Sequence, residues 1–358
     1  MSTEARKGRR KAAAYDAGVR RPTLRDVATR AGVHPATASR ALNPATRHLV
    51  NDETADRVDG IAQSLGYRPN PIARSLKTAR SASVGLLIPD LTNPLFPPIV
   101  RGIEDFLSHV GYNAWIVNTD NDAEREAAAV DSLRDRNVEG FVFATARLDH
   151  RLLEDLAAAD TPMVLVNRRV AKTDIPSVTA DDAAGVALAM RHLAELGHRT
   201  IAHLAGPQDT STGVNRLRAF RQALDDHDLP NVPERIAVCD AWTETAGADG
   251  LRRLLDATDD FTAILAGNDL IALGCYDVFA ERGMRIPQHV SIVGFNDIPV
   301  MDKLQPALTT VRIPQYDIGA EAARLLLDEL EQPSRHPRSV LLPLSLVVRR
   351  STAAPTRS

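Results

Sequence analysis

The sequence predicts an α/β protein in which a three-helix headpiece precedes a core of two doubly wound parallel-sheet subdomains. Two short helices joined by a glycine turn lie near the N-terminus. From residue 84 onward, short apolar strands alternate with amphipathic helices. Residues 1–80 carry 16 Lys or Arg against 7 Asp or Glu, whereas the remainder carries 27 against 39. A chain of 358 residues is long enough for two or three domains.

The stretch TLRDVATRAGVHPATASRALN, residues 23–43, predicts a helix-turn-helix. Thr23 is a good N-cap, and Asp26 stands three residues later, as in a capping box. Gly32 ends the first helix, and Pro35 occupies a favoured first position of the second. The second helix carries short polar groups and a cation suited to DNA: Thr37, Ser39 and Arg40. An ordinary α-hairpin is the alternative interpretation.

A third helix is expected over 52–65, with Asn51 as its N-cap. It completes a DNA-binding domain over 22–69, and the basic segment 70–80 is expected to act as a hinge or linker. The tail at 1–21 is basic and has few large apolar residues, so we expect it to be disordered. A cationic head on an anionic body suits a polyanionic partner for the head.

The core, residues 81–350, alternates strands and helices. Strands are expected at 84–90, 113–118, 140–145, 162–167, 200–206, 235–240, 261–267 and 290–296, and helices at 97–110, 123–136, 181–196, 213–227, 245–257 and 269–282. This alternation implies βαβ units and two parallel sheets covered on both faces. The final LLPLSLVVRR is expected to add one last strand, and no heptad-rich tail for a coiled coil follows it.

Neither a secretory nor a membrane segment is evident. The N-terminus is charged and no run approaches 18 apolar residues, so we expect a cytoplasmic protein. Cys239 and Cys275 offer no disulfide framework and no metal-binding CxxC pattern.

From Thr23 to about Arg349 the chain resembles the LacI/GalR family of bacterial transcriptional regulators. The head is similar to the family pattern TLxDVAxxAGVSxxTVSRVLN, and GYRPNPIARSLKTARSASVGLLIPDLTNPLF looks like its linker, hinge helix and first core strand. AGNDLIALG, RIPQHVSIVGFND and LTTVRIPQYDIGAEAARLLL match its C-terminal subdomain. The resemblance implies a periplasmic-binding-protein-like core and a homodimeric repressor of operator DNA, controlled by a small ligand. A ligand that closes the subdomains would shift operator affinity roughly 5- to 150-fold.

The resemblance also implies DNA contacts. The family's base-reading positions fall on Pro35, Ala36 and Arg40, and we expect Arg40 to read a base, most simply guanine. A phosphate clamp is the alternative for Arg40. Thr37 and Ser39 are expected to position the helix on phosphates. Thr23 is the remaining residue expected to bind DNA in the headpiece.

In the hinge, Leu76 takes the position of the family's minor-groove wedge, between Arg74 and Lys77. Alternatively, Leu76 caps the first core strand. Three departures from the family occur in the head. His34 replaces a serine N-cap, Ala38 replaces a core valine, and the turn at 43–50 is about two residues longer, which we expect to move Arg47 and His48 towards the DNA backbone.

The family's effector cleft corresponds to polar and aromatic positions at the carboxyl ends of the core strands, where ligands of such sheets bind. They are Asn93, Phe96, Asn118, Arg168, Thr212, Arg216, Trp242, Asn268 or Asp269, and Asn296 or Asp297. These groups suit a polyhydroxylated ligand, so sugars are the leading expectation and nucleosides or purines the second. The alternatives are packing roles for Phe96 and Trp242, and turn or cap roles for the Asn and Asp pairs.

Two other classes of protein fit less well. A periplasmic solute-binding protein would lack the basic head and carry a signal peptide. An α/β enzyme would be expected to show a GxSxG, GxxxxGK[ST], HExxH or GxGxxG motif, and none is present. His192, His198 and His203 do not share a helix face, so neither a metal site nor a cofactor is expected.

Overall fold

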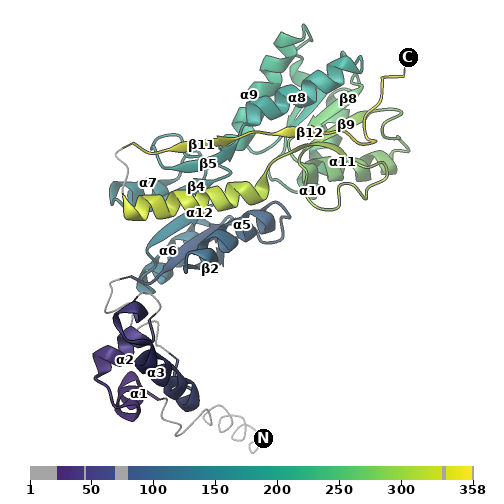
Figure 1. Cartoon of the computed structure of the whole chain (residues 1–358). Helices are drawn as coiled ribbons and strands as arrows, with labels where there is room; N and C mark the ends of the chain where they lie inside the picture. The colour runs from purple at the N-terminus through teal and green to yellow at the C-terminus, as the bar shows by residue number, and fades with distance from the viewer. Residues whose placement is uncertain (1–21, 44–45, 69–79, 333–335, 357–358) are drawn as a thin grey trace, which may run out of the picture. The chain divides into compact units, whose positions relative to one another are not determined.

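The computed structural model describes residues 22–43, 46–68, 80–332 and 336–356 (Figure 1). The chain divides into two compact units, Met1–Ser81 and Ala82–Ser358. The first unit contains the helical headpiece, and the second is the α/β core. In the described part of the chain, no helix is long and apolar enough to cross a membrane.

The headpiece contains the predicted helices α1 (Leu24–Ala31), α2 (Pro35–Ala41) and α3 (Asp52–Leu65), with a short 3-10 helix η2 (Arg47–Leu49) between the last two. The capping box is formed, since the Thr23 hydroxyl accepts from Asp26 N and the Asp26 carboxylate accepts from Thr23 N at 2.8 Å. Gly32 ends α1 with φ +65°, a left-handed conformation that favours glycine. Small side chains form the core of the headpiece: Val27, Ala28, Ala31, Ala38, Ala41, Ala55, Val58 and Ala62.

The departures around α2 have local structural consequences. His34 still serves as the N-cap, because its Nδ1 accepts from Ala36 N at 3.2 Å. Arg47, which was expected near the DNA backbone, is engaged within the headpiece. Its guanidinium donates instead to Asp56 and Asp59 of α3, at 2.6 Å each.

The first lobe of the core is a six-stranded, fully parallel sheet in the order β11-β5-β4-β3-β1-β2. Helices α6 and α7 pack on one face through Val130, Leu133 and Leu153, and α5 and α12 cover the other. The strands are β1 (Ser83–Ile88), β2 (Asn113–Asn118), β3 (Gly140–Phe143), β4 (Met163–Val166), β5 (Ser177–Ala180) and β11 (Ser339–Leu342). The helices are α5 (Phe96–His109), α6 (Ala123–Asp135), α7 (Arg151–Ala158) and α12 (Gln315–Glu331).

The second lobe repeats this architecture with strand order β12-β10-β9-β8-β6-β7, in which only β12 is antiparallel to its neighbour. Helices α8 and α9 pack together, as do α10 and α11 (Figure 1). The strands are β6 (Ile201–Ala205), β7 (Ile236–Val238), β8 (Ala263–Ala266), β9 (Ser291–Asn296), β10 (Thr309–Arg312) and β12 (Ser345–Val347). The helices are α8 (Asp182–Glu195), α9 (Ser211–Asp226), α10 (Glu244–Ala257) and α11 (Asp269–Glu281), with a 3-10 turn η3 (Pro233–Arg235).

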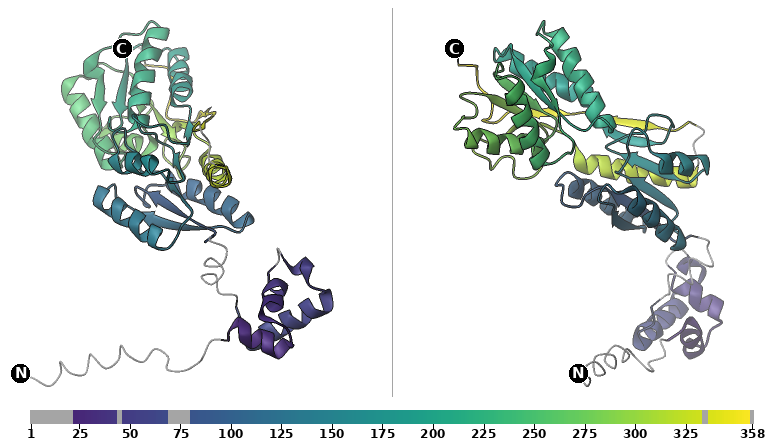
Figure 2. Two further views of the ribbon diagram at one scale, coloured as in Figure 1. Left: turned by 90° about the vertical axis from the view of Figure 1, so that its left-hand side faces the viewer. Right: turned by 180° about the vertical axis from the view of Figure 1, so that it is seen from behind.

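The C-terminal segment differs from its prediction. The single strand expected in LLPLSLVVRR is two strands, β11 and β12, because the chain leaves one sheet at Pro343 and Leu344 and enters the other. Proline cannot donate to a strand ladder, so it suits this change of sheet. The chain thus passes between the lobes three times: after β5, after β10 and after β11 (Figure 2).

Candidate functional site

A small pocket lies where the carboxyl ends of the two parallel sheets meet. It is lined by Asn93 and Leu95 after β1, Asn167 and Arg168 after β4, Thr212 and Arg216 on α9, Trp242 after β7, Asn268 after β8, and Asn296 at the end of β9. The cavity is only about 20 Å³, whereas ligand pockets usually measure about 300–1,000 Å³. The lobes must therefore separate, or side chains must move, before a sugar-sized molecule can enter.

Arg216 is the central group of this pocket. The side chain is 4% exposed, and its Nε donates to Asp182 Oδ1 at 2.8 Å. Its Nη1 donates to the Gly267 carbonyl at 2.7 Å. The guanidinium carbon lies 3.7 Å from the ring centroid of Phe295 and 5.6 Å from that of Trp242. These contacts fix the plane of the guanidinium, and Nη2 makes no hydrogen bond within the described part of the protein.

Asp182 balances the charge of Arg216. It stands in the first turn of α8, where the helix dipole favours an anion. Burial raises the pKa of Asp182, and the charge and hydrogen bond of Arg216 oppose that rise. The two residues therefore form a buried ion pair whose members depend on each other.

Trp242 forms a flat apolar wall of the pocket. A Cβ atom on Gly206 would lie 2.0 Å from its ring, so only glycine lets the indole pack this closely on the backbone. The indole Nε1 is buried without a hydrogen-bond partner among the described residues. An apolar ring face beside an unused donor suits a ligand with C–H surfaces and hydroxyl groups.

Arg168 is the second cation of the pocket, and it is 7% exposed. Its guanidinium has no hydrogen bond or ion pair with any described residue, and its Nε is fully buried. Burial lowers the pKa of Arg168 to about 10; the nearby charges of Arg147 and Arg216 add to this effect, and Asp209 opposes it.

Four asparagines line the pocket and supply carboxamide groups: Asn93, Asn167, Asn268 and Asn296. Asn268 uses its Oδ1 to cap α11, accepting from Ile271 N at 2.8 Å, as the alternative interpretation held. Asn296 has a buried Oδ1 without a partner in the described structure, and its φ is +118°. Asn167 also has positive φ, +65°. Such conformations are uncommon outside glycine and cluster at binding sites.

The structure brings seven of the predicted effector residues together and places four elsewhere. The seven are Asn93, Arg168, Thr212, Arg216, Trp242, Asn268 and Asn296. Phe96 does not line the pocket, because it is 2% exposed in the apolar core. Asn118 is also absent from the lining: it accepts from Leu91 N at 2.9 Å and contacts Asp120.

The two candidate carboxylates are likewise not pocket residues. Asp269 accepts from Thr310 Oγ1 at 2.5 Å and from Ile298 N at 2.8 Å. Asp297 pairs with Arg312 at 2.6 Å and with Arg349 at 2.7 Å. Both carboxylates therefore hold the loops of the second lobe.

Leu95 and Asn167 line the pocket but were not among the predicted site residues. Asn167 directly follows β4, and its position at a strand end was a usable signal. Leu95 carries no chemical signal in the sequence, since an apolar residue before a helix is ordinary core material.

Hydrogen bonds cross between the lobes at the edge of the pocket. Arg169 N donates to Ser211 Oγ at 2.9 Å, and Leu148 N donates to the Asp209 carbonyl at 2.8 Å. Arg147 adds a long ion pair to Asp209, at 3.9 Å. These contacts belong to a closed arrangement of the two lobes.

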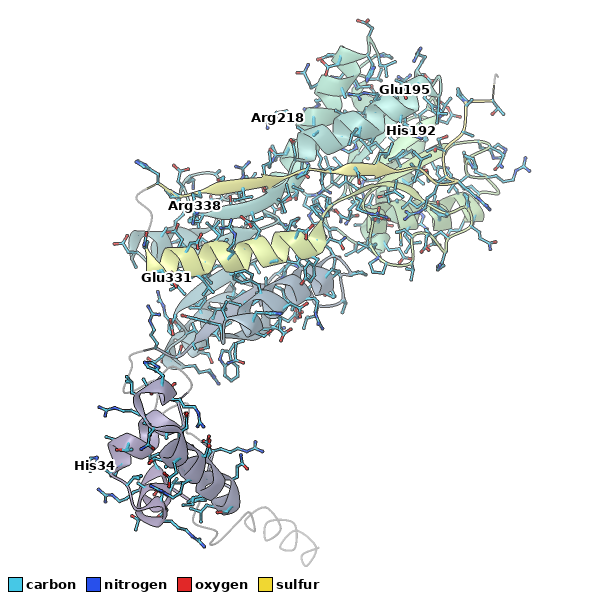
Figure 3. The ribbon with its side chains drawn as sticks, in the orientation of Figure 1. His34, His192, Glu195, Arg218, Glu331 and Arg338 are labelled. Carbon is cyan, nitrogen blue, oxygen red and sulfur yellow. The ribbon has the colours of Figure 1, made fainter. Side chains whose placement is uncertain are left out.

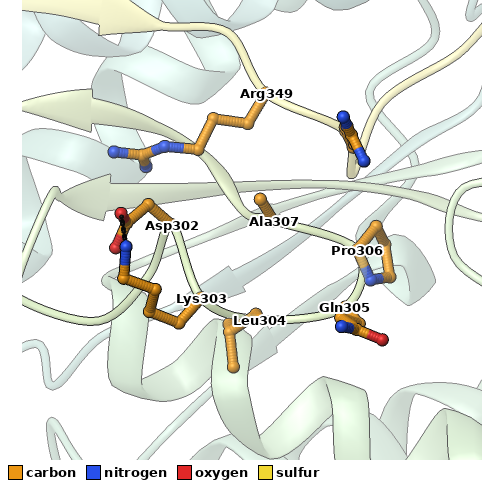
Figure 4. Close-up of a pocket in the computed structure, with 8 residues that line it drawn as sticks. Asp302, Lys303, Leu304, Gln305, Pro306, Ala307 and Arg349 are labelled. Atoms are coloured by element: carbon orange, nitrogen blue, oxygen red, sulfur yellow. Dashed lines mark hydrogen bonds and ion pairs between the residues drawn. The ribbon is translucent and has the colours of Figure 1, made fainter.

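A larger, open cavity of about 800 Å³ lies on the second lobe, beside the loop between β9 and β10 (Figure 4). Lys303 pairs with Asp302 at 2.7 Å, and Arg349 pairs with Asp297 at 2.7 Å. Two of the three cations that line this cavity therefore have carboxylate partners, and the third, Arg350, is exposed.

The histidines considered for a metal lie in separate polar contacts. His192 on α8 (Figure 3) contacts Thr352 Oγ1 at 3.0 Å, and His203 contacts the Leu265 carbonyl at 2.7 Å. His198 contacts Thr262 Oγ1 at 2.8 Å. Among the described residues, no group of three or more His, Cys, Asp or Glu side chains could hold a metal ion.

In the headpiece, α2 presents its polar residues on the surface. Ala36 and Arg40 are exposed, and Pro35, Thr37 and Ser39 are partly exposed. The exposed guanidinium of Arg40 makes no hydrogen bond or ion pair with another described residue, and only the Arg40 carbonyl accepts a side-chain hydrogen bond. The predicted hinge contacts, Arg74, Leu76 and Lys77, lie outside the described residues.

A helix-turn-helix unit joined to a two-lobed α/β core with a polar pocket defines a ligand-responsive DNA-binding regulator. Two protein-family models match the sequence. The one described as bacterial regulatory proteins, lacI family, matches residues 23–70, and the one described as a periplasmic binding protein-like domain matches residues 190–352. The ribose operon repressor of Halalkalibacterium halodurans is 36% identical over 330 residues, covering 92% of this chain and 97% of that repressor. The Escherichia coli repressor CytR is 32% identical over 333 residues, covering 93% and 96%.

Solved structures agree with these relatives. The lac repressor dimer bound to operator and the anti-inducer ONPF has a TM-score of 0.84 and 28% identity, covering 94% of this chain and all of that one. A complex of the regulator CelR with cellobiose has a TM-score of 0.70 and 31% identity, covering 92% and 100%. The chain belongs to the lacI family, and it is a DNA-binding transcriptional regulator.

Proposed function

We propose that this protein is a homodimeric repressor whose affinity for operator DNA is controlled by a sugar or sugar derivative bound between its lobes. The pocket is the observation that carries this proposal. It combines the indole of Trp242, the guanidinium of Arg216 and several carboxamides, which together suit C–H faces and hydroxyl groups. The protein would act in the cytoplasm, where its DNA is.

The relatives support a sugar rather than another small molecule. One relative is named a ribose operon repressor. Solved neighbours of the same family hold cellobiose and ribose. The unused donor of Trp242 and the unused acceptor of Asn296 would each find a hydroxyl partner in such a ligand.

For the headpiece, we propose that α2 lies in the major groove and that Arg40 contacts a base. Thr37 and Ser39 would contact phosphates, and Thr23 would support the start of α1. The exposure of Arg40 and its lack of a side-chain partner in the described headpiece support this assignment. The hinge contacts proposed for Arg74, Leu76 and Lys77 follow from the family pattern.

The proposed dimer would bury apolar surface that the single chain exposes. Trp115 and Ile116 on the edge strand β2 are 50% and 45% exposed, and Val110 after α5 is 51% exposed. An edge strand that exposes two large apolar side chains is unusual for a free surface. The lac repressor neighbour was solved as a dimer.

The test begins by selecting a binding sequence from a pool of randomised duplex DNA. Fluorescence anisotropy then measures the affinity of the full chain for that duplex, with and without each of a panel of sugars, sugar derivatives and nucleosides. We expect one class of ligand to change operator affinity roughly 5- to 150-fold, and binding to weaken steeply with salt, as phosphate contacts require. If no compound of the panel changes the affinity, the effector proposal fails; if no duplex is enriched, the proposed DNA contacts fail.

A further inference from the structure

We propose that the effector of this regulator carries an oxyanion, a carboxylate or a phosphate group, which binds the guanidinium of Arg168. The inference rests on the proposed function, because it takes the pocket between the lobes as the effector site. It narrows the ligand from sugars in general to acidic or phosphorylated sugars.

The charges that line the pocket support this class of ligand. Arg168 and Arg216 line it, and no Asp or Glu is among its lining residues. The carboxylates of Asp269 and Asp297, adjacent in sequence to two lining asparagines, are held by Thr310 and by two arginines instead. The lining is therefore cationic, whereas a site for a neutral polyol needs no excess of positive charge.

The two arginines differ in how their charge is balanced. Arg216 has a carboxylate partner, since Asp182 lies 2.8 Å from its Nε. Arg168 has no partner in the described structure, although it is buried to nearly the same extent. The carboxylate of Asp209 acts on Arg168 only at a distance, is 56% exposed, and is shared with Arg147. One positive charge of the closed pocket is therefore uncompensated.

A buried charge without a partner is strongly unfavourable, so the closed pocket is complete only when a ligand neutralises Arg168. The lowered pKa of Arg168, about 10, reflects this burial but leaves the group charged at neutral pH. A carboxylate or phosphate matches the planar fork of the guanidinium with two parallel hydrogen bonds. A hydroxyl group supplies a weaker, uncharged acceptor, so an oxyanion should be preferred.

The first arm of the test uses small anions and needs no knowledge of the effector. The melting temperature of the full chain is measured in sodium acetate, sodium phosphate and sodium chloride at equal ionic strength. Arg168→Gln removes the charge, Arg168→Lys keeps the charge without the planar fork, and Arg169→Gln is the matched control, since Arg169 is the exposed neighbour. Such salts stabilise proteins in general, so the difference between variants is diagnostic: we expect acetate or phosphate to raise the melting temperature of wild type and Arg169→Gln more than that of Arg168→Gln. Arg168→Gln should also melt higher than wild type in chloride.

The second arm compares matched neutral and anionic ligands by calorimetry: galactose with galacturonate, and ribose with ribose 5-phosphate. The acidic member of a pair should bind roughly 10- to 100-fold more tightly to wild type, as expected for hydrogen bonds to charged groups. Arg168→Gln should lose this preference, and Arg168→Lys should keep part of it. Preference for the uronate identifies a carboxylate, and preference for the sugar phosphate identifies a phosphate.

Two results would overturn the inference. One is an equal response of wild type and Arg168→Gln to the anions, together with no gain in melting temperature for Arg168→Gln. The other is a neutral sugar that binds as tightly as its acidic partner and changes operator affinity, which would leave the proposed function intact. If neither neutral nor acidic sugars change operator affinity but acetate or phosphate still stabilises the protein through Arg168, the proposed function fails and the oxyanion site stands.

Discussion

The buried ion pair between Arg216 and Asp182 allows a quantitative prediction. Arg216→Gln removes the cation and leaves Asp182, which is 7% exposed, without the group that opposes the burial-induced rise of its pKa. Asp182 must then either remain charged and unpaired or take up a proton. Breaking a buried pair in this way costs about 3–5 kcal/mol of unfolding free energy. Asp182→Asn should cost a similar amount, because it leaves the buried guanidinium of Arg216 without its carboxylate partner.

The double variant, Arg216→Gln with Asp182→Asn, tests whether the cost comes from the unpaired charge. It should be far less destabilised than the sum of the single variants, with a coupling of about 2–3 kcal/mol. Urea unfolding of the full chain, followed by tryptophan fluorescence, measures these values. Both tryptophans, Trp115 and Trp242, belong to the core, so the signal reports the core rather than the headpiece. The protein concentration is held fixed, because a dimer would make stability depend on it.

Additive effects of the two substitutions, or single costs below about 1 kcal/mol, would refute this interpretation of the pair, since such values are typical of exposed ion pairs. Arg216→Gln should also abolish the effector response while leaving operator binding in place at temperatures where the variant is folded. A retained response would remove Arg216 from the proposed effector site.

Three further predictions concern single residues. Arg40→Ala should cost about 1–3 kcal/mol at one operator position and relax specificity there; an equal loss on every duplex in the binding assay would assign Arg40 to phosphate. Burial raises the pKa of Asp269 from 3.8 to about 6, so its contribution to stability is fully present below about pH 4 and is lost as pH rises through about 6. Over this pH range the contribution of Asp269 to the unfolding free energy falls by about 3 kcal/mol. Asp269→Asn should therefore flatten the pH dependence of the unfolding free energy between about pH 4 and 6; an unchanged slope would contradict the raised pKa of Asp269. Gly206→Ala should displace the Trp242 indole, which a Cβ would approach to 2.0 Å, and so weaken effector binding in calorimetry. Gly60→Ala, where nothing lies within 4 Å of the added carbon, is the control and should stabilise α3 by about 0.5–1 kcal/mol; equal binding by the two variants would contradict the role of the indole.

The sequence predicted most of the fold because most elements carry strong local signals. The capping box at Thr23 and the apolar runs of the buried strands can be recognised within a few residues. Strands β5 (SVTA) and β10 (TTVR) were missed because their buried Ser177, Thr309 and Thr310 are polar. These hydroxyls are tolerated because partners distant in sequence satisfy them, and hydropathy gives no sign of such partners.

The site was predictable by position but not by side-chain direction. The pairs Asn268–Asp269 and Asn296–Asp297 both fall at strand ends, as expected for a ligand site. Which member lines the pocket depends on backbone conformation and on distant partners. Asn296 and Asp297 both have positive φ, and Asp297 is held by Arg349, 52 residues away. This information is absent from the local sequence. The sequence predicted carboxylates and cations in the pocket, whereas the lining contains Arg168 and Arg216 and neither aspartate.

The three passages of the chain between the lobes also constrain how the protein is made. During synthesis, the headpiece and strands β1 to β5 emerge first, but α12 and β11, which complete the first lobe, emerge only after β10 of the second lobe. Until then one face of the first sheet lacks its long covering helix, and β5 forms an open edge. The lobe that the ribosome starts first is finished last, so neither lobe can fold to completion before nearly the whole chain has been translated.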